Sequence, residues 1–327
     1  MGVAGSVLRS VSSSAGGRLA RGAALCSLLF VPSLAWAQPK APPLPADAIP
    51  KPQVVSLTTH DGQVIKATYY PGLRGKDSVP VILLHGFGGN RLDFLPLAQE
   101  LQRRGYACIA PDLRGHGESA AMRDAAGRTV KVVPEDLRLA DLAAMVAHDV
   151  EAVKKFLVTE NDAEKLNIEK LCLVGCDLGA SVAINFAARD WSFPQLPNLK
   201  QGQDVKAVVL ISPQWDYKGF GIGEALGHPA VQRQVNVEIL VGNKQARALA
   251  DARRLYRRLA RYRGLEGAKS EEDYRSSVVL IQAPTEEQGA KLLNLRGGFS
   301  DKAIDRFLDL HVLRATVPWA HRRRASE

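Results

Sequence analysis

The chain has 327 residues, of which 46% are hydrophobic and 24% charged, and its formal net charge is +9. This length supports a large hydrophobic core. The positive charge is small and spread along the sequence, so the composition gives no indication of a nucleic-acid-binding protein. The four cysteines are too few for a disulfide framework, and we expect Cys108, Cys172 and Cys176 to be buried free thiols.

The first 37 residues are typical of a secretory signal peptide. Three arginines and no acidic residue flank or precede an apolar stretch over residues 22–34, and a small-residue cleavage site ends at Ala37. The apolar stretch is too short for a membrane span, and Pro32 interrupts it. We therefore expect a periplasmic or secreted protein that is cleaved after Ala37, keeps no transmembrane span and carries a charge near +6. An uncleaved anchor is the alternative.

Three further segments follow the leader. Residues 38–52 are rich in proline and predict an extended linker. Residues 53–315 form the predicted domain, and residues 316–327 form a basic tail, in which the final HRRRASE is expected to be disordered.

The domain begins with two alternating segments around an Asp-Gly pair, over residues 54–72, which predict a β-hairpin. Short runs rich in Val, Ile and Leu then alternate with helical segments. Strands are expected within 79–90, 106–119, 171–174, 205–213, 236–243 and 276–284. This alternation predicts an α/β fold with a doubly wound, mostly parallel sheet, and the opening hairpin supplies an antiparallel edge at its N-terminal side.

The strand predicted at 171–174 leads into Gly175-Cys176-Asp177-Leu178-Gly179, and a helix rich in small residues follows. Such a strand, turn and helix usually carry the pattern G-x-S-x-G, with the reactive serine at the tip of the turn. Here Asp177 takes that position.

Three motifs, LLHGFGGN, APDLRGHGES and LVGCDLGASVA, occur in an order and spacing that resemble the α/β-hydrolase fold superfamily. The resemblance is to the group with esterases, dienelactone-hydrolase-like proteins and serine aminopeptidases, and it covers nearly all of residues 54–313. It implies a nucleophile at position 177, elbow glycines at Gly175 and Gly179, and no cofactor or metal. It also implies an oxyanion hole formed by the backbone N–H groups of Phe87 and Leu178.

The resemblance fails at the other two catalytic positions. The acid is expected at Gln245, and the histidine is expected at Gln288. Histidine takes and returns a proton near neutral pH, and a glutamine amide does neither. We therefore expect a pseudohydrolase that binds a small-molecule ligand or a partner.

An active hydrolase is the alternative interpretation. Haloalkane dehalogenases and epoxide hydrolases of this fold use an aspartate nucleophile, but they need a base to activate water in the second step. His228, with Asp216 as its acid, is the candidate for that base. Asp177 also has a structural interpretation, as a helix N-cap that backbone N–H groups hold in its ionised form.

A helical stretch over residues 245–264 is rich in arginine. Arg253, Arg254, Arg257 and Arg258 predict weak contact with an anionic surface, as in a cell-envelope interaction protein. A solvated amphipathic helix is the alternative.

Overall fold

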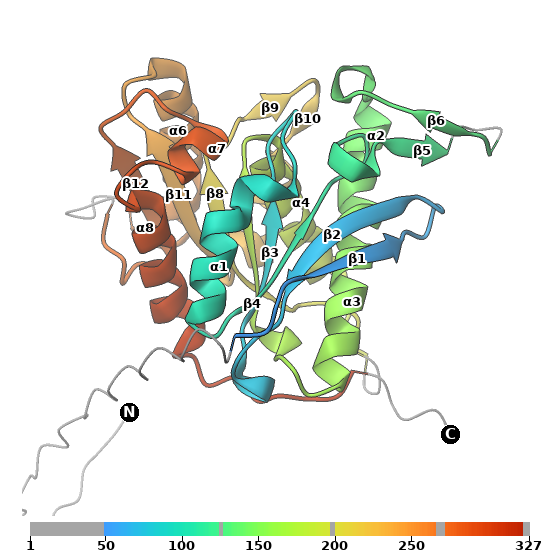
Figure 1. Ribbon diagram of the computed structural model, residues 1–327. Helices are drawn as coiled ribbons and strands as arrows, with labels where there is room; N and C mark the ends of the chain where they lie inside the picture. Colours follow the sequence, from blue (N-terminus) through green and yellow to red (C-terminus); the bar gives the residue numbers. More distant parts are fainter. Residues whose placement is uncertain (1–48, 124–126, 197–199, 266–271, 323–327) are drawn as a thin grey trace, which may run out of the picture. The chain divides into compact units, whose positions relative to one another are not determined.

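The computed structural model describes residues 49–123, 127–196, 200–265 and 272–322. The expected signal peptide and residues 38–48 of the expected linker lie outside these ranges. The described residues belong to one compact unit, whose elements are labelled in Figure 1. Every helix within the described ranges is too short or too polar to span a lipid bilayer.

The core of this unit is an eight-stranded sheet, in the order β1-β2-β4-β3-β7-β8-β11-β12. Its strands are β1 (Gln53–Thr58), β2 (Val64–Tyr70), β3 (Pro80–Leu84), β4 (Ala107–Pro111), β7 (Leu171–Cys176), β8 (Val205–Ile211), β11 (Asn236–Gly242) and β12 (Val278–Ala283). β2 pairs antiparallel with β1 and β4, and all other neighbours pair parallel. The predicted doubly wound, mostly parallel sheet with an antiparallel N-terminal edge is confirmed.

Helices cover both faces of the sheet (Figure 1). The described helices are α1 (Leu95–Arg103), α2 (Leu139–Ala144), α3 (Val150–Asp162), α4 (Leu178–Ser192), α5 (Pro229–Arg233), α6 (Ala246–Tyr262), α7 (Gly289–Leu293) and α8 (Phe299–Leu308). Buried residues of α1, α7 and α8 share one hydrophobic cluster, and those of α2 to α6 share the other. Each face of the sheet therefore has its own core.

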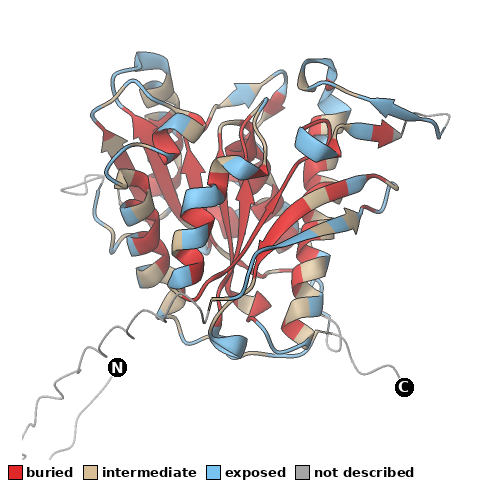
Figure 2. Cartoon of the chain, in the orientation of Figure 1, coloured by how far each residue is buried: buried red, intermediate tan, exposed pale blue. Residues whose placement is uncertain are grey.

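Alternation along the strands explains the two cores. In β8, Val208 and Leu210 belong to the cluster that includes α3 and α4, whereas Val209 and Ile211 belong to the cluster that includes α1 and α8. Successive side chains of a strand point to opposite faces, so a strand with a helical layer on each side is apolar throughout. Figure 2 accordingly shows the central strands as buried along most of their length. The three described cysteines are buried free thiols, as expected.

Two short hairpins were not predicted. β5 (Ala121–Arg123) pairs with β6 (Thr129–Lys131), and β9 (Asp216–Tyr217) pairs with β10 (Phe220–Gly221). Strands this short bury little apolar surface, so hydrophobic periodicity does not reveal them.

The chain after α8 runs back along the domain. The carbonyl oxygens of Val317 and Ala320 accept hydrogen bonds from Asn167 and Asn161, each at 3.0 Å. Arg322 forms ion pairs with Glu169 and Asp204. The expected disorder of the tail is therefore wrong for Arg322, because two carboxylates hold this arginine. Residues 323–327 lie outside the described ranges.

Candidate functional site

A sharp turn between β7 and α4 presents Asp177. This residue has φ 47° and ψ −112°, and a positive φ of this kind costs a non-glycine residue about 1–3 kcal/mol. Glycines on both sides permit the turn. A Cβ at Gly175 would collide with the carbonyl oxygen of Gly179, and a Cβ at Gly179 would collide with that of Leu84. The turn that normally presents a nucleophile is thus present, together with its strain.

The Asp177 carboxylate lies against two glycines from different parts of the chain. A Cβ at Gly86 would lie 2.7 Å from its Oδ2 atom, and a Cβ at Gly289 would overlap the same oxygen. Burial, and then repulsion from the carboxylate of Asp93, raise the pKa of Asp177 to about 6. The side chain is nevertheless partly exposed, so it remains accessible to a small molecule.

The interpretation of Asp177 as a helix N-cap is wrong. Its side chain accepts no hydrogen bond from the first turn of α4. An N-cap residue normally has extended backbone angles, which turn its side chain toward the helix N–H groups. The positive φ of Asp177 does not turn its side chain in that direction. Without those donors, burial dominates and the pKa rises instead of falling.

The two backbone N–H groups expected in the oxyanion hole form no hydrogen bond within the described part of the chain. Among the described residues, neither Phe87 nor Leu178 has an acceptor for its backbone N–H. Leu178 is the first residue of α4, where N–H groups have no intrahelical acceptor. The Phe87 ring lies between those of His116 and Tyr217, at centroid distances of 5.9 and 5.2 Å. The β9–β10 hairpin therefore lies over the turn that carries Phe87.

At the position expected for histidine, Gln288 is fixed by hydrogen bonds. Its Oε1 accepts from Ser212 Oγ at 2.7 Å and from the Gly242 N–H at 3.3 Å, and its Nε2 donates to the Gly242 carbonyl at 2.8 Å. Ser212 Oγ also accepts from the Gly289 N–H at 2.8 Å. Gln288 thus holds the backbone of the residue that touches Asp177 and makes no hydrogen bond to Asp177 itself.

At the position expected for the acid, Gln245 precedes α6 and is exposed. Its side chain makes no cap hydrogen bond, and the hydrogen-bond partners of Gln288 are Ser212 and Gly242 instead. The structure brings positions 177 and 288 together through Gly289. It gives position 245 no hydrogen bond to either of them.

The alternative base, His228, is not at the site. Its Nε2 lies 3.3 Å from Oγ of Ser192, the last residue of α4, whereas Asp177 immediately precedes the first. The helix between them has 15 residues, which corresponds to about 22 Å. Asp216 is exposed and accepts a hydrogen bond from the Gly219 N–H at 3.0 Å, within the β9–β10 turn. The expected Asp177–His228–Asp216 arrangement is therefore wrong.

Two histidines lie near the Phe87 turn and are fixed there. His85 Nε2 accepts from the Leu113 N–H at 3.0 Å, and its Nδ1 lies 2.8 Å from the Gly86 carbonyl. Burial lowers its pKa to about 4. The His116 Nδ1 lies 3.0 Å from a backbone carbonyl, and burial lowers the pKa of that ring too. Both are neutral structural residues at neutral pH.

All seven histidines of the sequence lie within the described ranges. His60 and His148 stack on each other, His311 contacts the Tyr274 carbonyl, and His321 packs on Trp319. The perturbation of Asp177 comes from burial and Asp93, with no contribution from an imidazole. None of the seven histidines forms a hydrogen bond or ion pair with the Asp177 carboxylate.

Sequence reasoning missed three residues of the site: Asp93, Ser212 and Gly289. Asp93 and Asn90 cap each other at the start of a short 3₁₀-helix over Arg91–Phe94, a local pattern that does not reveal the approach to Asp177. Ser212 has a positive φ of 51° and directly follows β8. Only the folded chain brings these segments together.

Two cavities are described, and Asp177 lines neither. One, of about 510 Å³, is lined by residues around His228 and Trp191. The other, of about 360 Å³, lies between Trp215 and α6. Among the described residues, no group of three or more His, Cys, Asp or Glu side chains is placed to hold a metal ion.

Known proteins resemble this chain in sequence over limited stretches. It is 38% identical over 68 residues to Lipase 1 of Psychrobacter immobilis, covering 21% of this chain and 20% of the lipase. It is 54% identical over 37 residues to a carboxylesterase of Bacillus subtilis, covering 11% of this chain and 15% of that enzyme. The matched stretches thus span about a fifth or less of these enzymes.

Solved structures resemble most of the chain. A dienelactone hydrolase from Anabaena variabilis matches with a TM-score of 0.54 and 19% identity, over 81% of this chain and 99% of that structure. A Pyrococcus furiosus esterase matches with a TM-score of 0.56 and 17% identity, over 82% of this chain and 94% of that structure. Identities this low establish a shared fold. Residues 79–277 match the family model described as alpha/beta hydrolase fold, and the chain belongs to that family.

Proposed function

We propose that this chain is a pseudohydrolase, a member of the α/β-hydrolase family that binds a small ligand at its former catalytic site without hydrolysing it. The observation that carries the proposal is the surroundings of Asp177. Its carboxylate lies against two glycines, and no imidazole forms a hydrogen bond or ion pair with it. A family member without a proton carrier at this point lacks the group that completes turnover.

The chemistry of an aspartate nucleophile explains why one missing group is decisive. A carboxylate attacks carbon without first losing a proton, so Asp177 has what the first step requires. Hydrolysis of the resulting ester needs water activated by a base. Gln288 stands at the position of that base, and its amide is already bonded to Ser212 and Gly242. An ester formed on Asp177 would persist.

The retained groups suit recognition of a small polar molecule. The N–H groups of Phe87 and Leu178 have no acceptor in the described chain, and Asp177 is a partly exposed carboxylate whose pKa is raised to about 6. Together they offer two donors and one acceptor, carried by the turn after β3 and the turn between β7 and α4. The proposal includes export, which rests on the leader that ends at Ala37.

Activity assays test this proposal directly. We expect the protein and its Asp177→Asn variant to show the same background rates on aryl esters, acyl esters, haloalkanes and epoxides. Turnover by the parent that the substitution abolishes would instead support the active hydrolase.

Restoration of the three catalytic side chains is a second test. We expect the triple variant Asp177→Ser, Gln245→Asp, Gln288→His to fold, and its ester hydrolysis to exceed that of Asp177→Ser alone. Circular dichroism of both variants shows whether the fold is kept. Equal rates in the two folded variants would mean that loss of these side chains is not what silences the site.

A further inference from the structure

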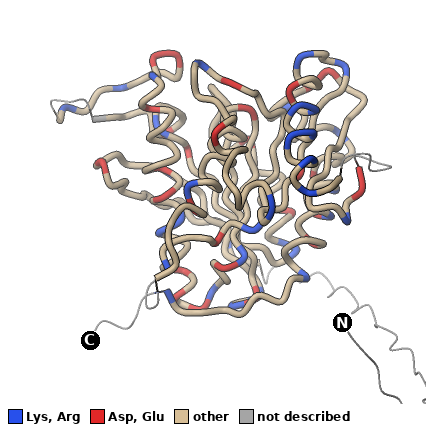
Figure 3. Tube along the Cα trace, turned by 180° about the vertical axis from the view of Figure 1, so that it is seen from behind, with Lys and Arg blue, Asp and Glu red and all other residues tan. Residues whose placement is uncertain are grey.

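A cavity of about 360 Å³ lies beside α6, on the side of the helix opposite its buried residues. It is lined by Trp215, Arg254, Arg257, Arg258, Arg261 and Tyr262. The arginines at positions 254 and 258, and those at 257 and 261, are four residues apart, which places them on one side of the helix. Leu255 and Leu259 are buried on the other side. Figure 3 shows the concentration of Lys and Arg along this helix.

Trp215 holds one of these guanidinium groups in place. The Arg254 guanidinium carbon lies 3.5 Å from the centroid of the Trp215 ring, and that of Arg258 lies 5.9 Å away. Arg258 also donates to the Gly223 carbonyl at 3.2 Å. Stacking on an aromatic ring fixes the plane of a guanidinium and leaves its N–H edge free for hydrogen bonds. Two arginines of the cavity are therefore oriented in advance.

The charge of this cavity is not compensated within the helix. Six arginines and one acidic residue, Asp251, occur in α6. Arg254 and Arg257 are exposed and form no ion pair or hydrogen bond with any residue of the described chain. Like charges three and four residues apart repel each other, so an anion from outside would relieve this repulsion.

Arg263, just beyond α6, shows how a structural arginine differs. It donates to the carbonyl oxygens of Val231, Gln232 and Ser277 at 2.8, 2.7 and 3.1 Å. Burial lowers its pKa to about 10. Its donors satisfy carbonyl groups of α5 and of the residue before β12, whereas Arg254 and Arg257 are exposed.

We propose that this cavity binds the phosphate monoester group of a small molecule or lipid. The planar guanidinium fork matches pairs of phosphate oxygens, and a phosphate monoester carries about −1.5 to −2 charges at pH 7 to offset several arginines. Trp215 and Tyr262 offer aromatic surface to the carbon part of the ligand. A volume of about 360 Å³ suits a ligand of small-molecule size. This site is separate from Asp177 and goes beyond the pseudohydrolase proposal.

Calorimetric titration with glycerol 3-phosphate tests the site. We expect Arg254→Gln with Arg257→Gln to weaken binding by about tenfold or more, since charge-assisted hydrogen bonds are lost. Arg247→Gln with Arg296→Gln is the matched control, because both of these residues are exposed and lie outside the cavity. The control makes the same change in charge, and we expect it to keep the affinity of the parent within about twofold. Equal weakening by both pairs, or no binding by the parent, would overturn the proposal.

Two further variants separate a built site from general attraction of charges. Trp215→Ala leaves the net charge unchanged but removes the surface on which Arg254 stacks, so we expect binding to weaken about fivefold. Arg254→Lys keeps the charge and loses the planar fork, and should weaken binding as well. Arg254 is exposed, so the lysine variant keeps the test decisive if Trp215→Ala does not fold. Parent-like affinity in Arg254→Lys would contradict the proposed geometry.

Sedimentation with lipid vesicles distinguishes a lipid headgroup from a soluble phosphate ligand. Sedimentation with vesicles of phosphatidic acid, but not with phosphatidylcholine alone, would support a lipid headgroup if Arg254→Gln with Arg257→Gln abolishes it. Binding of glycerol 3-phosphate without sedimentation would support a soluble ligand. We expect Asp177→Asn to leave both measurements unchanged, so this proposal and the pseudohydrolase proposal can fail independently.

Discussion

The two ends of β7 carry carboxylates with opposite surroundings. Before its first residue, Glu169 and the nearby Asp204 are surrounded by cationic side chains. After its last residue, Asp177 is largely buried beside Asp93, and among the described residues it has no ion-pair or hydrogen-bond partner. The same strand thus begins beside a network of ion pairs and ends at a carboxylate that forms none with the described residues.

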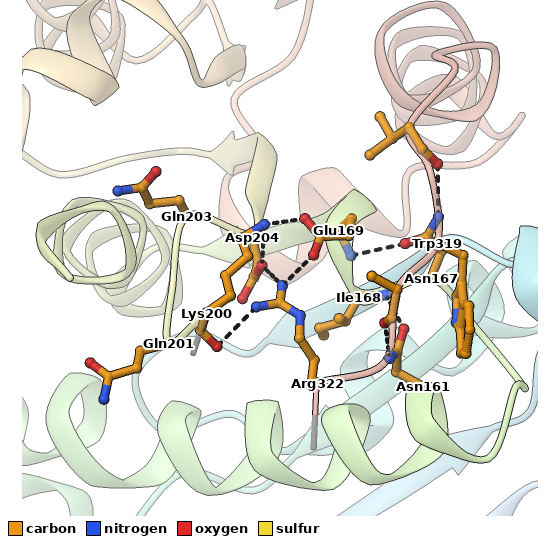
Figure 4. Close-up of polar contacts among 12 residues, drawn as sticks. Asn161, Asn167, Ile168, Glu169, Lys200, Gln201, Gln203, Asp204, Trp319 and Arg322 are labelled. Atoms are coloured by element: carbon orange, nitrogen blue, oxygen red, sulfur yellow. Dashed lines mark hydrogen bonds and ion pairs between the residues drawn. The ribbon is translucent and has the colours of Figure 1, made fainter. Parts of the chain in front are cut away.

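At the first end, every buried charge has a partner. Lys154 Nζ lies 2.9 Å from Asp204 and also pairs with Asp190. Figure 4 shows Arg322 reaching between Asp204 and Glu169. Burial alone would raise the pKa of Asp204, but Lys154 and Arg322 hold it below its usual value.

The difference between the two ends of β7 distinguishes a region that stabilises the fold from the candidate functional site. In open α/β sheets, ligands bind at the carboxyl ends of the strands, and strain and unpaired polar groups concentrate at functional sites. Asp177 keeps both features although no proton carrier accompanies it. The network at the opposite end contributes to stability, because it joins α3, α4 and the chain after α8.

The largest expected effect comes from breaking the paired end. Lys154→Met leaves Asp190 and Asp204 buried with one cation fewer, and loss of one partner from a buried pair costs about 3–5 kcal/mol. The free energy of unfolding in urea measures this loss. Lys165→Met is the control, because Lys165 pairs with Glu160 with 56% of its side chain exposed, and such pairs contribute about 1 kcal/mol or less. Equal losses in the two variants would contradict the contrast between the two ends.

A smaller effect of opposite sign is expected at Asp177. Its folded-state pKa of about 6 exceeds the ordinary 3.8, so the folded state resists ionisation of this group. The loss of stability caused by the ionised carboxylate is absent below about pH 4. It increases between pH 4 and pH 6 and is complete above pH 6. We expect Asp177→Asn to raise the free energy of unfolding by about 2–3 kcal/mol at pH 8 and by little at pH 4.

Urea unfolding at both pH values checks this dependence. Asp136→Asn serves as the control, because Asp136 is exposed, and we expect it to change stability by less than about 0.5 kcal/mol at either pH. A gain for Asp177→Asn that is the same at pH 4 and pH 8 would show that burial of the charge is not its source.

The fold was predictable because its signals are local. Apolar runs such as residues 205–213 and 236–243 have the composition of strands covered on both faces, and β8 and β11 begin at the expected residues. The glycines of the turn around Asp177 are equally visible in the sequence. The need for glycine at position 175 comes from the nearby carbonyl of Gly179, so that part of the turn requires no distant contact to be known.

The surroundings of Asp177 were not predictable, since they depend on residues far apart in the chain. Asp93 precedes it by 84 positions and Gly289 follows it by 112. The sequence shows aspartate before a helix, a pattern that favours an N-cap, and only the backbone angles exclude that role. His228 failed as a base for a similar reason, because it packs at the far end of α4.

The smallest expected effect isolates the crowding of Asp177. Gly289→Ala adds a methyl group that overlaps the Asp177 carboxylate at a positive φ of 55°. Gly298→Ala is the matched control, because Gly298 has a φ of 65° and its nearest neighbour would lie 3.7 Å from the new carbon. Both variants place alanine in the left-handed region, which lowers the free energy of unfolding by about 1 kcal/mol. We expect urea unfolding to show a further loss of about 1 kcal/mol for Gly289→Ala. Asp177→Gly removes the carboxylate, so the excess should disappear when Gly289→Ala is made in that background. An excess that persists there would place the crowding on the backbone, and the carboxylate would then not be what makes this end of β7 unsatisfied.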